Sequence, residues 1–122
     1  MNYRDARAAI RYAVDVLGFV EAAVYADDAD DSVVVHSELR WPEGGGIMIG
    51  SAGRADSEFS QMPTGCASSY VVTDDPKAVL ARCVQAGSEI VRDLREEDYG
   101  SLGFSVRDAE GNMWSFGTYR GE

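Results

Sequence analysis

The feature that most constrains the fold of this chain is that its two halves carry nearly the same pattern. One helix is predicted to begin after Asp5 and another after Asp75, because each aspartate can cap a first turn and apolar residues follow at helical spacing. Pro76 suits the first helical position, where its missing N–H leaves no hydrogen bond unmade. Gly18 and Gly87 are predicted to end these helices in the left-handed conformation that glycine adopts readily. The apolar residues predicted to be buried are Ile10, Ala13, Val14 and Leu17 in the first helix, and Val79, Leu80, Cys83 and Val84 in the second.

Strand-like segments follow each helix in the same order. They lie at about 20–25, 32–40 and 46–51 in the first half, and at about 88–92, 102–107 and 112–119 in the second. Identical residues recur 67 positions apart in the last hairpins: Arg40 and Arg107, Glu43-Gly44 and Glu110-Gly111, Gly50 and Gly117. The pattern predicts an α+β fold in which a strand–helix–three-strand unit occurs twice.

The duplication also predicts how the chain is organised. We expect one domain over 1–122, with module 1 at about 1–51, a connector at about 52–67 and module 2 at about 68–119. The connector, rich in Gly, Ser and Asp, is either a functional flap or a plain surface crossover. The acidic segment 26–31 lacks the glycine and terminal glutamate of a calcium loop, so we predict a solvated hairpin tip there.

Composition narrows the partners. Eleven Lys and Arg against 21 Asp and Glu give a net charge of −10, which disfavours nucleic acid and anionic membranes. No apolar run approaches the ~20 residues of a membrane span, and the N-terminus lacks the apolar region of a signal peptide. The two cysteines, Cys66 and Cys83, have the spacing of neither a disulfide framework nor a zinc knuckle. We therefore expect a cytoplasmic protein with a small-molecule partner.

Segments in both halves of the chain carry a resemblance to a known family. The second half contributes the segments Tyr70-Val71-Val72-Thr73-Asp74-Asp75-Pro76, Gly87, and Arg107-Asp108-Ala109-Glu110-Gly111-Asn112-Met113-Trp114-Ser115-Phe116, in which the Asp-x-x-Gly-Asn turn is most specific. The first half contributes Asp5 through Leu17-Gly18-Phe19, His36-Ser37-Glu38-Leu39 and Gly44-Gly45-Gly46-Ile47-Met48. On these residues the chain resembles the glyoxalase/bleomycin-resistance/dioxygenase superfamily, also called vicinal oxygen chelate proteins. The resemblance implies two βαβββ modules whose mixed sheet curls around a cleft, in a homodimer.

The resemblance also implies where a metal would bind. Enzymes of the superfamily hold a divalent ion with four ligands, and the family spacing places three of these positions at Met48, Ser68 and Ser115. The fourth position would precede Met1. The three or four residues before the first helix are also few for a sheet strand, so either a partner supplies the edge or the true start lies upstream. Hydroxyls and a thioether are poor ligands for the hard and borderline cations of the family. We therefore expect neither a metal nor another cofactor.

Strand alternation and the family pattern together predict the lining of the cleft. The same alternation turns Trp114, Phe116, Phe104 and Val106 toward the core and Gly103 toward the cleft. Trp41, in a tight turn, is predicted to be exposed unless a partner chain or ligand covers it. Phe59, Met62 and Tyr99 are candidates for the rim, where each either contacts a ligand or packs at a dimer interface. The predicted ligand-binding residues are Val34, His36, Glu38, Met48, Ser68, Tyr70, Ser105, Met113, Ser115 and Tyr119.

The leading hypothesis is a metal-free binding protein, similar to bleomycin-resistance-type proteins, that sequesters a partly aromatic ligand without transforming it. Neither cysteine has the setting of an activated nucleophile. An acidic segment with Asp93, Glu96, Glu97 and Asp98 is either a solvated loop or, with Glu38, a rim that attracts a cationic ligand.

Two enzyme alternatives remain open. One is a metal-dependent lyase, isomerase or dioxygenase of the same superfamily. The other is a metal-free acid–base enzyme in which Glu38 supports His36 as the general base.

Overall fold

The helix of each half starts where an aspartate side chain closes its first turn. In the computed structural model, which describes residues 1–98 and 100–122, Asp5 and Asp75 each accept a hydrogen bond from the backbone N–H three residues on. Gly18 and Gly87 follow the helices with φ angles of 105° and 75°. The predicted starts and ends of both helices are confirmed. Tyr99, a predicted rim residue, lies outside the described residues.

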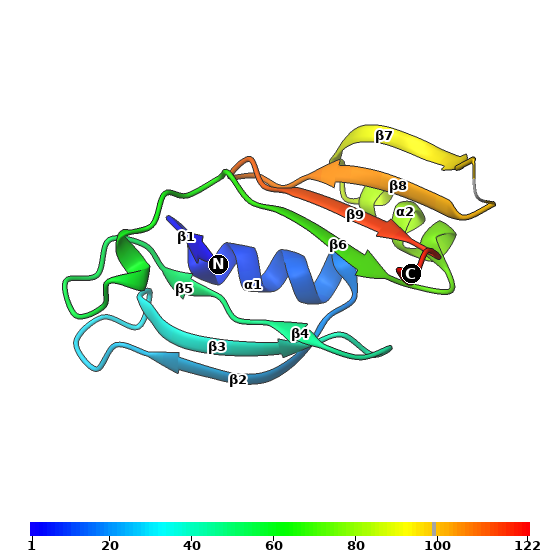
Figure 1. The fold of residues 1–122 in the computed structure, drawn as a ribbon. Coiled ribbons are helices and arrows are strands. Elements are labelled where there is room, and N and C mark those ends of the chain that lie inside the picture. Colours follow the sequence, from blue (N-terminus) through cyan, green and yellow to red (C-terminus); the bar gives the residue numbers. More distant parts are fainter. Residues whose placement is uncertain (99) are drawn as a thin grey trace. The chain divides into compact units, whose positions relative to one another are not determined.

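The chain divides into two units, Met1–Gly65 and Cys66–Glu122 (Figure 1). The first unit follows the predicted order, with a π-helical turn continuing its helix. Its elements are β1 (Asn2–Tyr3), α1 (Ala6–Tyr12), the π-helix η1 (Ala13–Leu17), β2 (Val20–Ala26), β3 (Val34–Arg40), β4 (Gly46–Ile47), β5 (Gly50–Ser51) and the 3-10 helix η2 (Phe59–Gln61).

The sheet of the first unit is interrupted in one strand. β4 pairs antiparallel with β3, β3 pairs antiparallel with β2, and β5 pairs parallel with β1. Met48 and Ile49 separate β4 from β5. The buried Ser37 hydroxyl on β3 spans this break, since its Oγ donates to the Ile49 carbonyl (2.7 Å) and accepts from the Ile49 N–H (3.1 Å). The side chain thus replaces a missing rung of the ladder.

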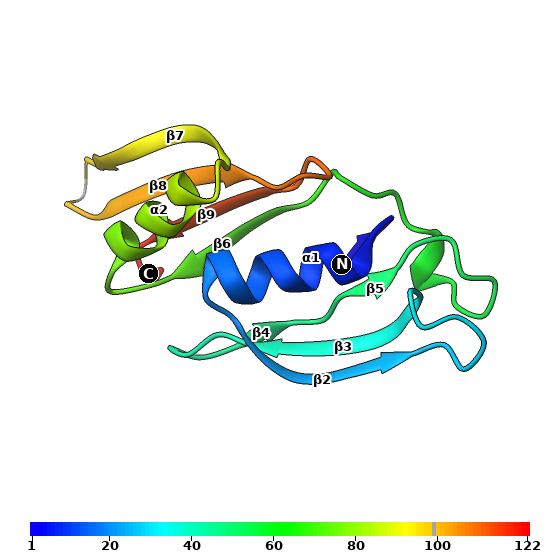
Figure 2. The same ribbon diagram turned by 180° about the vertical axis from the view of Figure 1, so that it is seen from behind.

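The second unit has the same order of elements with an uninterrupted last strand. Its sheet runs β6-β9-β8-β7, with β6 parallel to β9 and the other neighbours antiparallel. Figures 1 and 2 show α2 against one face of this sheet. The elements are β6 (Ser68–Val72), α2 (Pro76–Gln85), β7 (Glu89–Glu96), β8 (Leu102–Arg107) and β9 (Met113–Gly117).

Strand register confirms the duplication of the βαβββ unit. In unit 1 Arg40 faces Gly46, and in unit 2 Arg107 faces Met113, each 67 positions later. The parallel pairs agree, since Gly50 and Gly117 each face the short strand that precedes their own helix. The fold is α+β, as predicted.

The core of unit 2 lies between the sheet and α2. Trp114, Phe116, Phe104 and Val106 are buried, as are Val79 and Cys83 on the helix. The predicted orientation of Trp114 toward the core is confirmed. Val84 is 60% exposed, contrary to prediction, because the buried stripe runs through Pro76, Val79 and Cys83 and turns Val84 outward.

Trp41 corrects a second prediction. Its side chain is only 8% exposed, and its ring lies 4.9 Å from the Phe19 ring at an interplanar angle of 58°. The Trp41 N–H donates to the Gly45 carbonyl, and the Gly44 N–H donates to the Trp41 carbonyl. This closed turn brings the indole back over the protein, which a pattern of turn residues alone does not reveal.

The segment predicted as a connector is ordered around one serine. Ser60 is buried, and its Oγ donates to the carbonyls of Arg54 and Ser57. The Asn2 side chain donates to the Phe59 carbonyl, which ties this segment to β1. Residues 52–65 therefore form part of the first unit.

Candidate functional site

Four side-chain positions form a row across the sheet of unit 2. Tyr70 on β6 faces Ser115 on β9, Ser115 faces Ser105 on β8, and Ser105 faces Arg92 on β7. Residues that face one another on neighbouring strands share a face of the sheet. Because Trp114 and Phe116 alternate with Ser115 and are buried, this row lies on the face away from α2.

Glycines make room beside the row. Gly117 follows Ser115 by two positions on the same face and pairs with Gly103. A Cβ atom added to Gly117 would lie 2.7 Å from the Tyr70 hydroxyl oxygen and 3.0 Å from the Leu102 carbonyl oxygen. The Tyr70 ring therefore lies over the bare backbone of Gly117, and its hydroxyl donates to the Tyr119 carbonyl (2.8 Å).

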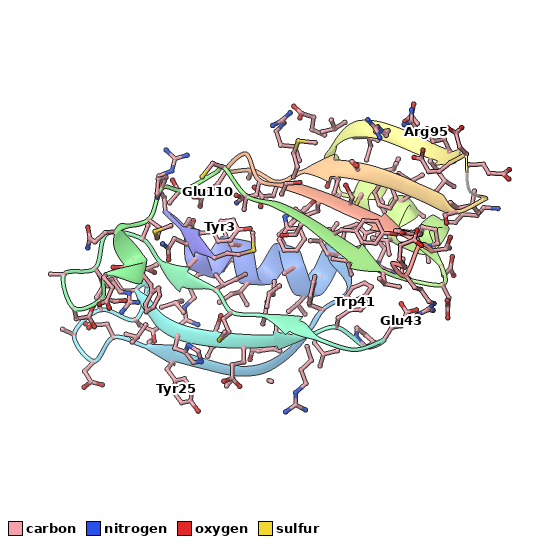
Figure 3. All side chains as sticks on the ribbon, in the orientation of Figure 1. Tyr3, Tyr25, Trp41, Glu43, Arg95 and Glu110 are labelled. Carbon is pink, nitrogen blue, oxygen red and sulfur yellow. The ribbon has the colours of Figure 1, made fainter. Side chains whose placement is uncertain are left out.

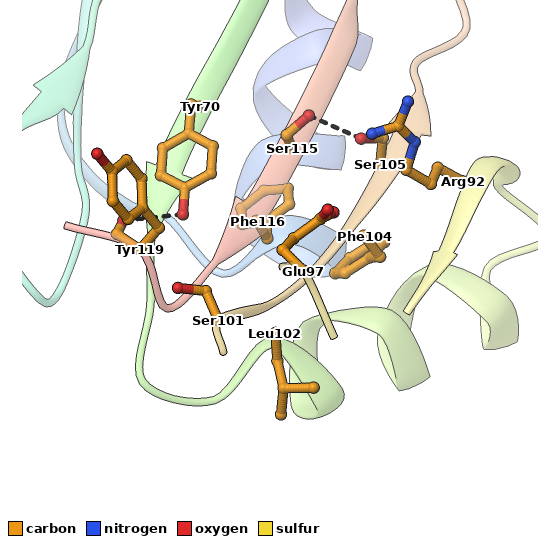
Figure 4. A pocket seen from close by; sticks show the side chains of 11 residues that line it. Tyr70, Arg92, Glu97, Ser101, Leu102, Phe104, Ser105, Ser115, Phe116 and Tyr119 are labelled. Carbon is orange, nitrogen blue, oxygen red and sulfur yellow. Dashed lines mark hydrogen bonds between the residues drawn. The ribbon is translucent and has the colours of Figure 1, made fainter. Parts of the chain in front are cut away.

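This face holds a pocket with a volume of about 200 Å³ (Figure 4). Aromatic rings, small hydroxyl-bearing side chains, one arginine and one glutamate surround it. The lining residues are Tyr70, Arg92, Glu97, Ser101, Leu102, Gly103, Phe104, Ser105, Ser115, Phe116 and Tyr119.

The polar groups of the pocket differ in whether they are already paired. The Ser105 and Ser115 hydroxyl oxygens are 2.7 Å apart and share a hydrogen bond. Glu97 accepts a hydrogen bond from the Arg95 Nε at 3.1 Å. The Arg92 side chain makes no hydrogen bond or ion pair with another residue among those that the structure describes. Its guanidinium is therefore the charge of the pocket that remains available to a ligand.

The Asp-x-x-Gly-Asn turn holds the start of β9 in place. The buried Asp108 carboxylate accepts from the Glu110 and Asn112 N–H groups, the Asn112 amide and the Trp114 Nε1–H, at 3.0–3.2 Å. Asn112 in turn accepts from the Ala67 N–H at 3.0 Å, which connects β9 to the chain entering β6. The most specific motif of the sequence therefore positions the row, while its side chains take no part in the pocket.

A second polar group lies on β3 in unit 1. His36 Nε2 and Glu38 Oε1 are 3.2 Å apart, and the Tyr25 ring stacks on His36 with centroids 6.2 Å apart. Figure 3 shows Tyr25 standing clear of β2. The predicted His36–Glu38 pair exists, and both side chains are accessible to solvent.

Val34 lies apart from this pair. An extra residue in β3 shifts the pairing with β2 between Tyr25 and Ala26, which resets the alternation along the strand. Val34 is fully buried, whereas His36 and Glu38 are not. The predicted alternation of Val34 with His36 and Glu38 on one face is therefore wrong.

The residues at the family's metal positions do not fit a divalent ion. The Ser115 hydroxyl is engaged by Ser105, the Met48 thioether is on a side chain that is 59% exposed, and Ser68 offers a neutral hydroxyl. Hard divalent cations require carboxylate, carbonyl or imidazole ligands to offset the loss of hydration. Over 1–98 and 100–122, no group of three or more His, Cys, Asp or Glu side chains is arranged to hold a metal.

The structure brings together four of the ten predicted ligand-binding residues in one pocket: Tyr70, Ser105, Ser115 and Tyr119. Ser68 and Met113 face each other on β6 and β9, two residues before the Tyr70–Ser115 pair, and do not line the pocket. The remaining four, Val34, His36, Glu38 and Met48, belong to unit 1.

The prediction missed Arg92, Glu97 and Ser101 as lining residues. Arg92 reaches the row because a register shift interrupts the pairing of β7 between Ile90 and Arg92. The broken alternation of Glu89-Ile90-Val91-Arg92 in the sequence was a signal for such an irregularity.

Within the described part of the chain, the helices are all too short or too polar to cross a membrane. No curated protein matches the sequence.

Solved structures share the fold over nearly the full chain. TioX from Micromonospora sp. ML1 is 26% identical, with a TM-score of 0.81, and the match covers 98% of this chain and 94% of TioX. UcmS2 is 15% identical (TM-score 0.73; 98% and 93% covered), and the oxidase ChaP-H2 is 18% identical (TM-score 0.71; 98% and 89% covered). At these last two identities the likeness concerns the fold alone. The model of the Glyoxalase/Bleomycin resistance protein/Dioxygenase superfamily matches residues 1–116, so this chain belongs to that superfamily.

Proposed function

We propose that this protein binds a small, partly aromatic molecule in the pocket on the sheet of unit 2, without a metal and without transforming it. The observation that carries the proposal is the row from Tyr70 through Ser115 and Ser105 to Arg92 on the floor of a pocket of about 200 Å³. Pockets that combine apolar and aromatic walls with a few fixed polar groups are typical of small-molecule sites.

The chemistry of the lining supports binding rather than turnover. Among the described residues of the pocket, Glu97 has the one carboxylate, and this carboxylate already accepts a hydrogen bond from Arg95. The serine hydroxyls bond to each other, so neither is paired with a base that would activate it as a nucleophile. Such groups can orient a ligand through hydrogen bonds, while the Tyr70 and Tyr119 rings supply contact area.

A metal titration tests the metal-free part of the proposal. Isothermal calorimetry with Ni, Zn, Mn and Fe salts should show no saturable binding, because the residues at the family's metal positions are Met48, Ser68 and Ser115. Submicromolar binding of any of these ions would contradict the proposal and favour a metal-dependent lyase, isomerase or dioxygenase.

The His36–Glu38 pair supports one second candidate, a metal-free acid–base enzyme. A carboxylate 3.2 Å from the imidazole can orient it for proton transfer. A His36→Ala variant separates the candidates. Under the binding proposal neither the native chain nor the variant turns over a ligand, and both bind ligands of the unit 2 pocket with the same affinity. Turnover by the native chain that the variant loses while it keeps its affinity would support the enzyme.

We also propose that the protein acts as a cytoplasmic homodimer. Its superfamily membership and exposed apolar side chains such as Phe59, which is 75% exposed, support a dimer. The two cysteines, Cys66 and Cys83, are not joined in a disulfide, which supports the location.

A further inference from the structure

We infer that the pocket selects ligands that carry an acidic oxygen group, such as an aromatic carboxylate, and that Arg92 and the Ser105–Ser115 pair bind this group. The inference deepens the proposed function and rests on it. It reverses the sign of the ligand charge that the acidic segment of the sequence suggested.

The side chain of Arg92 differs from those of its basic neighbours on the same sheet in having no partner among the described residues. Arg95 is held by Glu97, and Arg107 is held by Glu89 at 2.6 Å. The Arg92 side chain lines the pocket and forms neither a hydrogen bond nor an ion pair with any other residue that the structure describes. A free guanidinium presents two parallel N–H donors, which match the two oxygens of a carboxylate.

The serine pair adds a donor next to this guanidinium. Two hydroxyls that share one hydrogen bond retain one hydrogen for a further acceptor. Ser105 faces Arg92 on the adjacent strand β7, and Ser115 faces Ser105 on β9, so whichever hydroxyl keeps this hydrogen lies on the same face of the sheet as the guanidinium. An anionic oxygen group can accept from both, whereas an ammonium group would meet the like charge of Arg92.

The other end of the row suits an aromatic ring. Tyr70 and Arg92 are on the first and last strands of the four-stranded sheet, three strand spacings apart. With ~4.8 Å per spacing, their backbones are separated by about 14 Å, and side chains from both ends extend over the row. A ring beside Tyr70 and an acidic group beside Arg92 therefore fit one small molecule.

The acidic residues of β7 and of the loop after it do not oppose this assignment at short range. Asp93, Glu96 and Asp98 do not line the pocket, and the Glu97 carboxylate is occupied by Arg95. At physiological salt, interactions between exposed charges fall off over about 8 Å, so the net charge of −10 acts weakly on a ligand that contacts Arg92 directly.

The experiment compares three probes with the same ring: 2-naphthoate, 2-naphthamide and 2-naphthylmethylammonium. Binding to the full chain is measured by NMR titration of the amide resonances. We expect the carboxylate to bind about tenfold more tightly than the amide, as a charge-assisted hydrogen-bonded pair contributes, and the ammonium to bind most weakly. Arg92→Gln should bring carboxylate and amide within about twofold, and Arg92→Lys should restore part of the preference.

Arg107→Gln is the matched control, because it removes the same charge from the same sheet at an arginine that is already paired. It should preserve the preference for the carboxylate. Equal binding of all three probes, tightest binding of the ammonium probe, or an unchanged preference in Arg92→Gln would overturn this inference and leave the proposed function standing. Failure of all three probes to bind would overturn both.

Discussion

Asp108 shows how a single carboxylate organises the site without contacting it. Burial of a charged group is tolerated only when hydrogen bonds replace its hydration. Asp108 receives four such bonds from the turn and from Trp114. Gly111 completes the turn with a φ of 105°, a conformation that side chains with a Cβ rarely adopt.

Replacement of Asp108 should therefore destabilise the fold strongly. We expect Asp108→Ala to lower the free energy of unfolding by about 3 kcal/mol, because buried N–H donors lose a charged acceptor. The control is Asp93→Ala, which removes an exposed aspartate on β7 and should lower the free energy of unfolding by less than about 0.5 kcal/mol. Chemical denaturation of the two variants measures both changes. Equal losses in the two variants would show that Asp108 has no special structural role.

In the acidic turn after β2, carboxylates accept hydrogen bonds from backbone N–H groups of the same turn. Asp27 accepts from the N–H groups of Ala29 and Asp30, and Asp30 accepts from the N–H and hydroxyl of Ser32. These bonds support the predicted solvated hairpin tip. The hydrogen bonds from the Ser32 side chain and backbone lower the pKa of Asp30.

Loss of the Ser32 hydroxyl should raise the pKa of Asp30 toward its ordinary value, because one of the two donors to the carboxylate disappears. NMR titration of the Asp30 carboxyl in Ser32→Ala measures the change. In the native chain the lowered pKa stabilises the fold above the unfolded-state pKa, and this stabilisation is lost as the pH falls through the folded-state pKa. An unchanged pKa in the variant would assign the effect to the backbone donor.

At the scale of elements, the space around equivalent strand positions can be compared between the two halves, because Gly50 and Gly117 correspond to each other. A Cβ at Gly117 would meet Tyr70 and the Leu102 carbonyl at 2.7 and 3.0 Å, whereas the nearest atom at Gly50 is 3.6 Å away. The absence of a side chain at Gly117 therefore leaves room for the Tyr70 ring, whereas Gly50 has no comparably close neighbour.

We expect Gly117→Ala to destabilise the protein by about 1–3 kcal/mol and to shift the Tyr70 ring resonances, because the added methyl group overpacks the strand. Gly50→Ala, the matched control, should change stability by less than about 0.5 kcal/mol. Thermal unfolding and aromatic NMR spectra measure both effects. A Tyr70 ring that keeps its resonances in Gly117→Ala would contradict the proposed packing.

The helices, the strands and their duplication could largely be predicted from the sequence, because helix caps and apolar periodicity depend on residues close together in the chain. The 67-residue offset that relates Arg40 to Arg107 recurs in the strand pairing. The errors arose where distant contacts decide. One register shift, between β2 and β3, buries Val34, and another, between β7 and β8, brings Arg92 to the row. A closed turn folds Trp41 onto Phe19.

At the scale of the whole molecule, the two units place different chemistry on the same repeated frame. The sheet of unit 1 carries an accessible His36–Glu38 pair, and that of unit 2 carries hydroxyls, a tyrosine and an arginine whose side chain is unpaired among the described residues. Duplicated sheets with diverged surfaces let one fold serve many functions. The assignment of function therefore depends on these side chains.

The oligomeric state is a prediction at the same scale. Light scattering at micromolar concentration should give twice the mass of the chain. Phe59→Asp together with Met62→Asp should shift the mass toward the monomer, because both exposed apolar side chains are proposed interface residues. The proposal of a dimer through this segment would fail if the double variant kept the dimer mass.

The most direct test of the central claim is an NMR map of 2-naphthoate binding to chelator-treated protein. The account predicts saturable shifts at Tyr70, Ser105, Ser115 and Arg92, with the probe recovered unchanged. Shifts confined to His36 and Glu38, or binding that requires an added divalent metal, would contradict it.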